Sequence, residues 1–109
     1  MSALSFILPD SNAIYFNQGF RDVLESYLPM LRMSRGTIVS KVAPVDGIKF
    51  KFDLDGYLIA QQVPSYLHWV IARINGLKSS QEFGPQVEFL LIPDADELEQ
   101  VRQIYMTTR

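Results

Sequence analysis

Cysteine is absent from this chain of 109 residues, and histidine occurs once, as His68. Without cysteine the chain cannot form disulfide bonds, thiolate metal sites or a cysteine nucleophile. A lone histidine cannot build a histidine metal cluster, and beside an aromatic residue on a helix it is typical of a structural side chain. We therefore predict no catalytic residues, no metal ligands and no cofactor, and expect a protein that is not an enzyme.

The chain also lacks a surplus of charge and a long hydrophobic run. Ten Lys and Arg against twelve Asp and Glu give a net charge of −2 without a block of either sign, so nucleic acid is not an expected partner. No apolar stretch reaches the roughly 18 residues of a membrane span. Pro9 and Asp10 break the first apolar run, which has no basic start, so no signal peptide is predicted and folding in the cytoplasm is expected.

Hydrophobic residues make up 48% of the chain and aromatic residues 12%, which suffices for one core in a domain of this length. Helix-like and strand-like patterns both occur, and they predict an α+β fold. We expect a single globular unit. Residues 1–35 would form an N-terminal arm and an amphipathic helix, and residues 36–109 the remaining core with a C-terminal helix.

The N-terminal part mixes apolar side chains with a turn cluster over the first sixteen residues, which predicts an arm that packs on its own domain or on a neighbour. Apolar residues then recur at three- and four-residue steps, which predicts an amphipathic helix over 18–33. Asn17 is suited to cap its start. Pro29 lies inside the pattern, so the helix is expected to kink or end near Tyr27.

A β-hairpin is predicted next. Residues 37–43 are rich in β-branched side chains, residues 48–53 alternate apolar with polar ones, and a Pro and Asp-Gly turn separates them. Short helices are then expected over 56–63 and 65–75, and a buried strand over 87–92. Proline ends that strand, and a C-terminal helix follows it.

Four short sequences between residues 50 and 93 together indicate a fold through their order along the chain. They are Tyr57-Leu58-Ile59-Ala60, Ala72-Arg73-Ile74-Asn75-Gly76-Leu77, Phe83-Gly84 and Leu91-Ile92-Pro93. In this order they resemble the LysM domain, whose two helices and last strand carry sequences of these kinds. The resemblance implies a LysM-like β-α-α-β core within residues 36–109. One segment departs from it, because glycan-binding LysM domains have Gly-Asp-Thr or a close variant where this chain has residues 52–56.

A narrower resemblance involves the second helix. Leu67-His68-Trp69-Val70-Ile71-Ala72, followed by Asn75, closely resembles the aromatic helix of LysM-like domains in baseplate wedge and hub proteins of tailed phages. That resemblance implies a structural protein, a non-enzymatic adaptor in the virion tail or baseplate that is assembled in the host cytoplasm. Its partners would be other tail or baseplate proteins or further copies of itself. The candidate interface residues are Ile14, Tyr15, Phe16, Tyr66 and Trp69.

The alternative function is a peptidoglycan- or chitin-binding LysM module. Its groove would lie between the turn at 53–57 and the loop at 77–84, where aromatic rings could stack on sugars. The candidate groove residues are Asp53, Asp55, Tyr57, Leu77 and Phe83.

Two other chemistries carry less weight. A small hydrolase would need Ser79 or Ser80 near His68 and a carboxylate. The string from Asp53 to Gly56 resembles the start of a calcium loop, but Pro64 occupies the position of the bidentate Glu, so a capped turn is expected instead.

Overall fold

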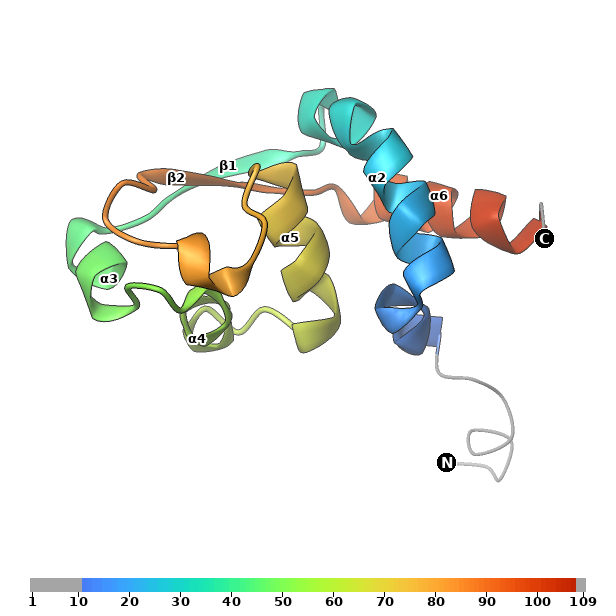
Figure 1. Ribbon diagram of the computed structural model, residues 1–109. Helices are drawn as coiled ribbons and strands as arrows, with labels where there is room; N and C mark the ends of the chain where they lie inside the picture. The colour runs from blue at the N-terminus through green and yellow to red at the C-terminus, as the bar shows by residue number, and fades with distance from the viewer. Residues whose placement is uncertain (1–10, 108–109) are drawn as a thin grey trace.

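A computed structural model describes residues 11–107 (Figure 1). Within that range the chain forms five α-helices, three short 3-10 helices and a two-stranded sheet, which confirms the α+β class. In chain order the elements are η1 (Ser11–Phe16), α2 (Gln18–Met33), β1 (Ile38–Lys41), α3 (Pro44–Lys49), α4 (Leu54–Ala60), η2 (Ser65–Leu67), α5 (His68–Ile74), η3 (Ser80–Glu82), β2 (Phe89–Ile92) and α6 (Ala95–Thr107).

The sheet joins two segments that are far apart in the sequence. β1 and β2 run antiparallel, and their register places Ile38 opposite Ile92 and Lys41 opposite Phe89. Five helical segments, α3, α4, η2, α5 and η3, lie between the two strands in the chain. The strand pairing therefore closes a long loop and brings both ends of this helical region together.

The predicted hairpin between 37–43 and 48–53 is wrong, because the second of these segments is not a strand. Pro44 stands in the first turn of α3, where its fixed φ favours a helix and its missing N–H costs no hydrogen bond. Asp46 in the first turn and Lys49 in the last turn match the helix dipole. The alternating residues therefore belong to the end of a short helix and the turn that follows it.

α2 confirms the predicted amphipathic helix and its cap. The Asn17 side-chain oxygen accepts a hydrogen bond from the backbone N–H of Phe20 at 3.0 Å. The helix continues through Pro29 to Met33, so it does not end near Tyr27, while the alternative of a kink there stays a prediction. Pro29 is exposed and removes one backbone hydrogen bond, while a buried stripe on the opposite side holds the helix to the core. The stripe consists of Phe20, Leu24, Leu28 and Leu31.

The remaining predicted elements are present with shifted bounds. The two short helices predicted over 56–63 and 65–75 correspond to α4 and to η2 with α5. α4 begins earlier than predicted, since the Asp53 carboxylate accepts a hydrogen bond from Gly56 N at 2.9 Å and so caps the helix. β2 and α6 correspond to the predicted last strand and C-terminal helix.

α5 is shared by two hydrophobic clusters. Val70 and Ile74 belong to the first, whereas Ile71 and Ala72 belong to the second. The buried members of the first are Tyr15, Phe20, Leu24, Leu28, Leu31, Val70, Ile74, Leu98 and Val101. Those of the second are Val42, Leu54, Tyr57, Leu58, Ile71, Ala72, Phe83 and Leu90. Figure 1 shows α5 between the sheet region and the pair α2 and α6, which explains how one short helix serves both.

The N-terminal part shares its core with the C-terminal part. Of the predicted arm, residues 1–10 lie outside the described residues, while residues 11–16 form η1 and pack on their own domain through Tyr15. α2 and α6 meet in the first cluster. The proposed division at residue 35 stays a prediction.

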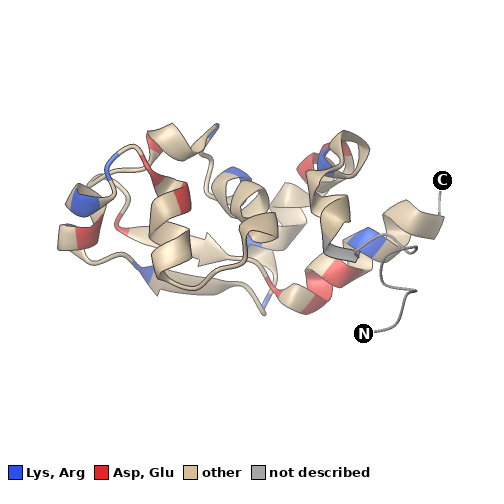
Figure 2. Ribbon diagram, turned by 90° about the horizontal axis from the view of Figure 1, so that it is seen from below, with Lys and Arg blue, Asp and Glu red and all other residues tan. Residues whose placement is uncertain are grey.

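The surface charge is mixed. Figure 2 shows Lys and Arg interspersed with Asp and Glu along both halves of the molecule. Among the helices of residues 11–107, none has the length and apolar character needed to cross a membrane.

Asn75 ties the end of α5 to β2. Its amide nitrogen donates to Leu91 O at 2.9 Å and to Ile71 O at 2.7 Å. Its side-chain oxygen accepts from Leu91 N at 2.7 Å, so the amide pairs with β2 much as a neighbouring strand would. Gly76 follows with φ +77°, a conformation that a residue with a side chain rarely adopts.

Replacing Asn75 with Ala should lower the free energy of unfolding by about 2–3 kcal/mol, because three hydrogen bonds are lost and partly buried backbone groups of Leu91 lose their partner. Urea unfolding followed by circular dichroism measures this change. The exposed Gln100→Ala on α6 is the control and should change stability by less than about 0.5 kcal/mol. Equal effects of the two substitutions would contradict the role given to Asn75.

Candidate functional site

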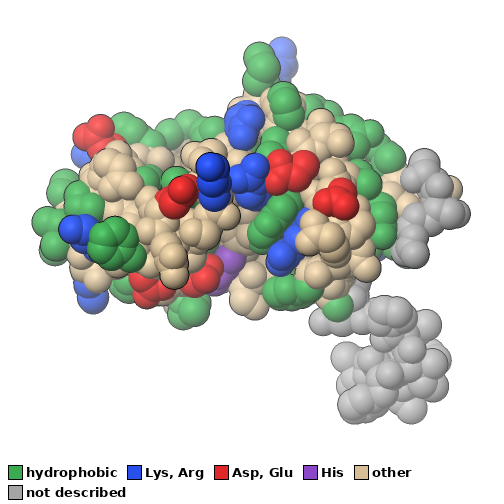
Figure 3. Space-filling view, in the orientation of Figure 1, with side chains coloured by type: hydrophobic (Ala, Val, Ile, Leu, Met, Phe, Trp, Pro, Cys, Tyr) green, Lys and Arg blue, Asp and Glu red, His purple; other side chains and the backbone are tan. Residues whose placement is uncertain are grey.

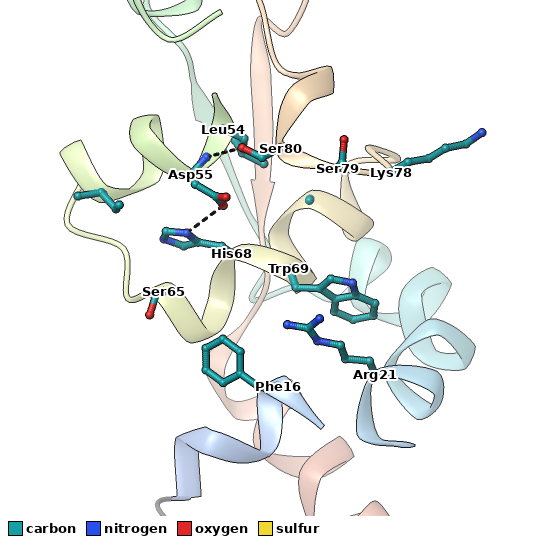
Figure 4. Close-up of a pocket in the computed structure, with 12 residues that line it drawn as sticks. Phe16, Arg21, Leu54, Asp55, Ser65, His68, Trp69, Lys78, Ser79 and Ser80 are labelled. Atoms are coloured by element: carbon teal, nitrogen blue, oxygen red, sulfur yellow. Dashed lines mark hydrogen bonds and ion pairs between the residues drawn. The ribbon is translucent and has the colours of Figure 1, made fainter. Parts of the chain in front are cut away.

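A cleft of about 460 Å³ opens where η1, α2, α4, α5 and the loop before η3 meet (Figure 4). Residues of different chemistry line it, including Phe16, Arg21, Asp55, His68, Trp69 and Ser80. The cleft depends on the tertiary fold, because its lining residues range from Phe16 to Ser80, which spans more than half of the chain.

Arg21 occupies one wall of the cleft. Its Nε–H donates to Tyr15 O at 2.8 Å. The guanidinium carbon lies 5.0 Å from the centre of the Trp69 ring and 5.7 Å from that of Phe16, within cation–π range. Burial lowers the pKa of Arg21 from its ordinary value. In the described part of the chain, its two terminal nitrogens have no hydrogen-bond partner and no carboxylate pairs with them.

His68 occupies the other wall, and both of its ring nitrogens face acceptors. Nδ1 lies 3.2 Å from Asp55 Oδ1, and Nε2 lies 3.0 Å from Val63 O. A neutral imidazole carries one N–H, so both contacts are hydrogen bonds only when both nitrogens are protonated. The ring is buried while the Asp55 carboxylate is largely exposed. His68 thus ties α5 to α4 and to the segment that joins them.

The serine, histidine and aspartate of this cleft do not form the contact that a hydrolase uses. Ser80 Oγ accepts a hydrogen bond from the backbone N–H of Asp55 at 2.9 Å. The ring nitrogens of His68 are directed to Asp55 and Val63, and Figure 4 shows no bond between His68 and a serine. The nucleophile–base pair that activates a serine is therefore not assembled in this arrangement.

The predicted interface residues fall into three groups by exposure. Phe16 is 58% exposed, on the rim of the cleft. Tyr15 is buried, with its ring 5.1 Å from those of Phe20 and Tyr66, so it is not exposed for contact with a neighbour as an interface residue would be. The same burial raises the pKa of the Tyr15 phenol. The other predicted residues, Ile14, Tyr66 and Trp69, are partly buried against the first cluster.

The predicted glycan groove is only partly assembled. The turn and the loop that would flank it do meet, since Asp55 N donates to Ser80 Oγ at 2.9 Å. However, Tyr57 and Phe83 are buried and stack on each other with ring centres 5.1 Å apart. The faces of both rings therefore lie in the core. A buried aromatic pair removes more apolar surface from water than the same pair would at an open groove.

The other three predicted groove residues also have structural contacts. Asp53 caps α4, and Asp55 faces His68. Leu77 is partly buried against the second cluster. Within residues 11–107 there is no group of three or more His, Asp or Glu arranged to hold a metal ion.

A second surface feature was not predicted from the sequence. Val45, Ile48 and Phe52 are 67%, 66% and 62% exposed, and we call these three residues the apolar tip. Val45 and Ile48 lie three residues apart on α3, so they share a face. Figure 3 shows hydrophobic side chains at the end of the molecule that α3 forms. Phe52 has φ +66°, which is unusual and unfavourable for a bulky residue.

Sequence patterns missed Arg21 and the apolar tip for different reasons. Arg21 stands on the polar side of an amphipathic helix, and only the approach of η1 and α5 places it beside aromatic rings. The alternation across residues 48–53 predicts a strand, and a strand pattern gives no sign that Ile48 and Phe52 are both exposed.

Comparison with known proteins finds no matching family model, no similar curated protein and no similar solved structure. The functional argument therefore depends on the residues and geometry of this chain.

The contacts of His68 predict unequal effects of two substitutions. His68→Ala should lower the free energy of unfolding by about 2 kcal/mol, because a buried side chain is truncated and Val63 O loses its donor. Asp55→Ala should cost less than about 1 kcal/mol, since the carboxylate is largely exposed to water and a contact made by an exposed side chain contributes little. Urea unfolding at one fixed pH compares the two variants. A larger loss for Asp55→Ala would show that His68 is held differently.

Proposed function

We propose that this chain is a structural, non-enzymatic adaptor in the tail or baseplate of a bacteriophage, where it binds neighbouring proteins by packing. The observation that carries the proposal is the apolar tip. Three large apolar side chains are each more than 60% exposed at this end of the molecule, and none of them belongs to either hydrophobic cluster. A grouped apolar surface of this kind marks an interaction site more often than scattered exposed residues do.

Backbone strain at Phe52 supports the same proposal. A bulky residue with positive φ costs on the order of 1 kcal/mol or more, and this residue also exposes an aromatic ring to water. Both costs are unfavourable in the isolated chain. Burial of the ring by a neighbour would offset them, at about 25 cal/mol for each Å² of apolar surface removed from water.

The arrangement of β1, α4, α5 and β2 supports a LysM-like core, which remains part of the proposal. Three of the sequences that carry the LysM resemblance lie on or directly after a helix or strand. Residues 57–60 belong to α4, Asn75 and Gly76 follow α5, and Pro93 follows β2. The antiparallel pairing of β1 with β2 gives the two-stranded sheet that such a core needs, although β1 lies earlier in the chain than the strand predicted over 48–53.

The proposed location is the virion, and the proposed partners are other tail or baseplate proteins or further copies of this chain. Fractionation of a lysate from cells that produce both the chain and virions tests this. The chain should sediment with intact virions, and antibodies against it should label the tail end in electron micrographs. Recovery of all of the chain in the soluble fraction, with unlabelled virions, would contradict the proposal.

Glycan binding remains the alternative, and one observation favours it. The turn at 53–57 and the loop at 77–84 lie together, as the groove requires, through the hydrogen bond from Asp55 N to Ser80 Oγ. Sedimentation with insoluble peptidoglycan tests it. Retention that is lost on substitution of Lys78 or Ser79 in that loop would favour a glycan-binding module over the adaptor.

Substitutions at the apolar tip should separate binding from stability. Phe52→Asn should raise the free energy of unfolding by about 0.5–1 kcal/mol, because Asn tolerates positive φ better than Phe. Combined with Val45→Ser and Ile48→Ser, it should reduce the virion-bound fraction severalfold. The control is Met33→Ser, which removes an exposed apolar side chain at the end of α2. Equal loss of virion association in the control would exclude the apolar tip as the docking surface.

A further inference from the structure

We propose that the cleft beside Arg21 binds a carboxylate, and that an acidic segment of a partner protein supplies it. The source of the carboxylate rests on the proposed adaptor function, whereas the carboxylate chemistry rests on the cleft alone. The cleft volume of about 460 Å³ lies within the range of sites that hold small ligands or side chains, roughly 300–1,000 Å³.

The guanidinium of Arg21 is already oriented for a ligand. The hydrogen bond from Nε to Tyr15 O fixes one edge of the guanidinium. The rings of Phe16 and Trp69 restrict the orientation of the guanidinium plane. Both terminal nitrogens remain without a partner among residues 11–107, so they can donate two parallel hydrogen bonds to one carboxylate. Because the side chain is held in place before binding, little rotamer freedom is lost on association.

The charge of Arg21 is not neutralised inside the cleft. Asp55 is the acidic residue in the lining, and its carboxylate faces His68 (Figure 4). Burial is the cause of the lowered pKa of Arg21, and a guanidinium stays charged at neutral pH despite such a shift. A cation that is partly removed from water and lacks a counter-ion attracts an anion more strongly than an exposed one does.

The aromatic rings favour a protein segment over a sugar. A sugar needs a free aromatic face, but Arg21 covers one face of Trp69, and Tyr57 and Phe83 stack on each other. The exposed Phe16 and Ile59 beside the cleft offer apolar surface to the residues that flank an acidic side chain in a peptide. The geometry therefore fits a glutamate or aspartate with apolar neighbours.

Trp69 provides a direct readout, because it is the one tryptophan in the chain and its ring lies 5.0 Å from the Arg21 guanidinium carbon. Its fluorescence is followed while the full chain is titrated with the capped peptide acetyl-Ala-Leu-Glu-Leu-Ala-amide at constant ionic strength. The same peptide with Gln in place of Glu is the first control. We expect saturable binding of the Glu peptide and at least tenfold weaker binding of the Gln peptide.

Variants of the chain then identify the group that binds. Arg21→Gln should weaken binding of the Glu peptide at least tenfold, and Arg21→Lys severalfold, because Lys keeps the charge but not the planar pair of donors. Arg35→Gln makes the same chemical change at an exposed turn outside the cleft and should bind as the unsubstituted chain does. Circular dichroism and the thermal midpoint show which variants are folded. If Arg21→Gln does not fold, Arg21→Lys decides the outcome.

Three results would overturn the inference. Equal binding of the Glu and Gln peptides excludes a carboxylate, and unchanged binding by a folded Arg21 variant excludes this cleft. Tighter binding of N-acetylmuramic acid than of the Glu peptide would assign the carboxylate to a glycan instead of a protein. The titration uses the isolated chain, so its failure is distinct from a failure to find the chain in virions.

Discussion

Burial of α5 on two sides at once is the constraint on which the rest of the structure depends. Val70 and Ile74 face the helices α2 and α6, while Ile71 and Ala72 face α4 and the sheet. A helix of two turns is not stable alone in water, so these contacts hold it in place. The two clusters lie on opposite sides of α5. Leu67, just before α5, packs against both clusters. Loss of α5 would therefore separate the two halves of the core.

The ends of α5 extend this role to the sheet and the cleft. At its C-terminal end, Asn75 bonds both backbone groups of Leu91 and so fixes β2 beside the helix. At its N-terminal end, His68 and Trp69 project toward Asp55 and Arg21 respectively. The cleft is therefore built on the same short helix that organises the core, and its geometry should be as rigid as the core itself.

The chain keeps several large apolar side chains and one partly buried cation in contact with water. The apolar tip is exposed at one end of the molecule, and Arg21 is partly buried in the cleft, where no carboxylate of residues 11–107 pairs with it. Each of these is unfavourable for an isolated domain and becomes favourable when a partner of matching chemistry covers it. The adaptor proposal and the carboxylate proposal both start from groups that are unfavourable in the isolated chain and that a partner would stabilise.

Local chemistry in the sequence determined the α+β class, the helix stripe and caps of α2, the two short helices, and the last strand and helix. These features depend on neighbouring residues, as when Asn17 caps α2. Tertiary structure alone decided that β1 pairs with β2, that Tyr15, Tyr57 and Phe83 are buried, and that Arg21 stands between two rings. The physical reason is that strand pairing and burial depend on contacts between residues far apart in the chain, which periodicity does not encode.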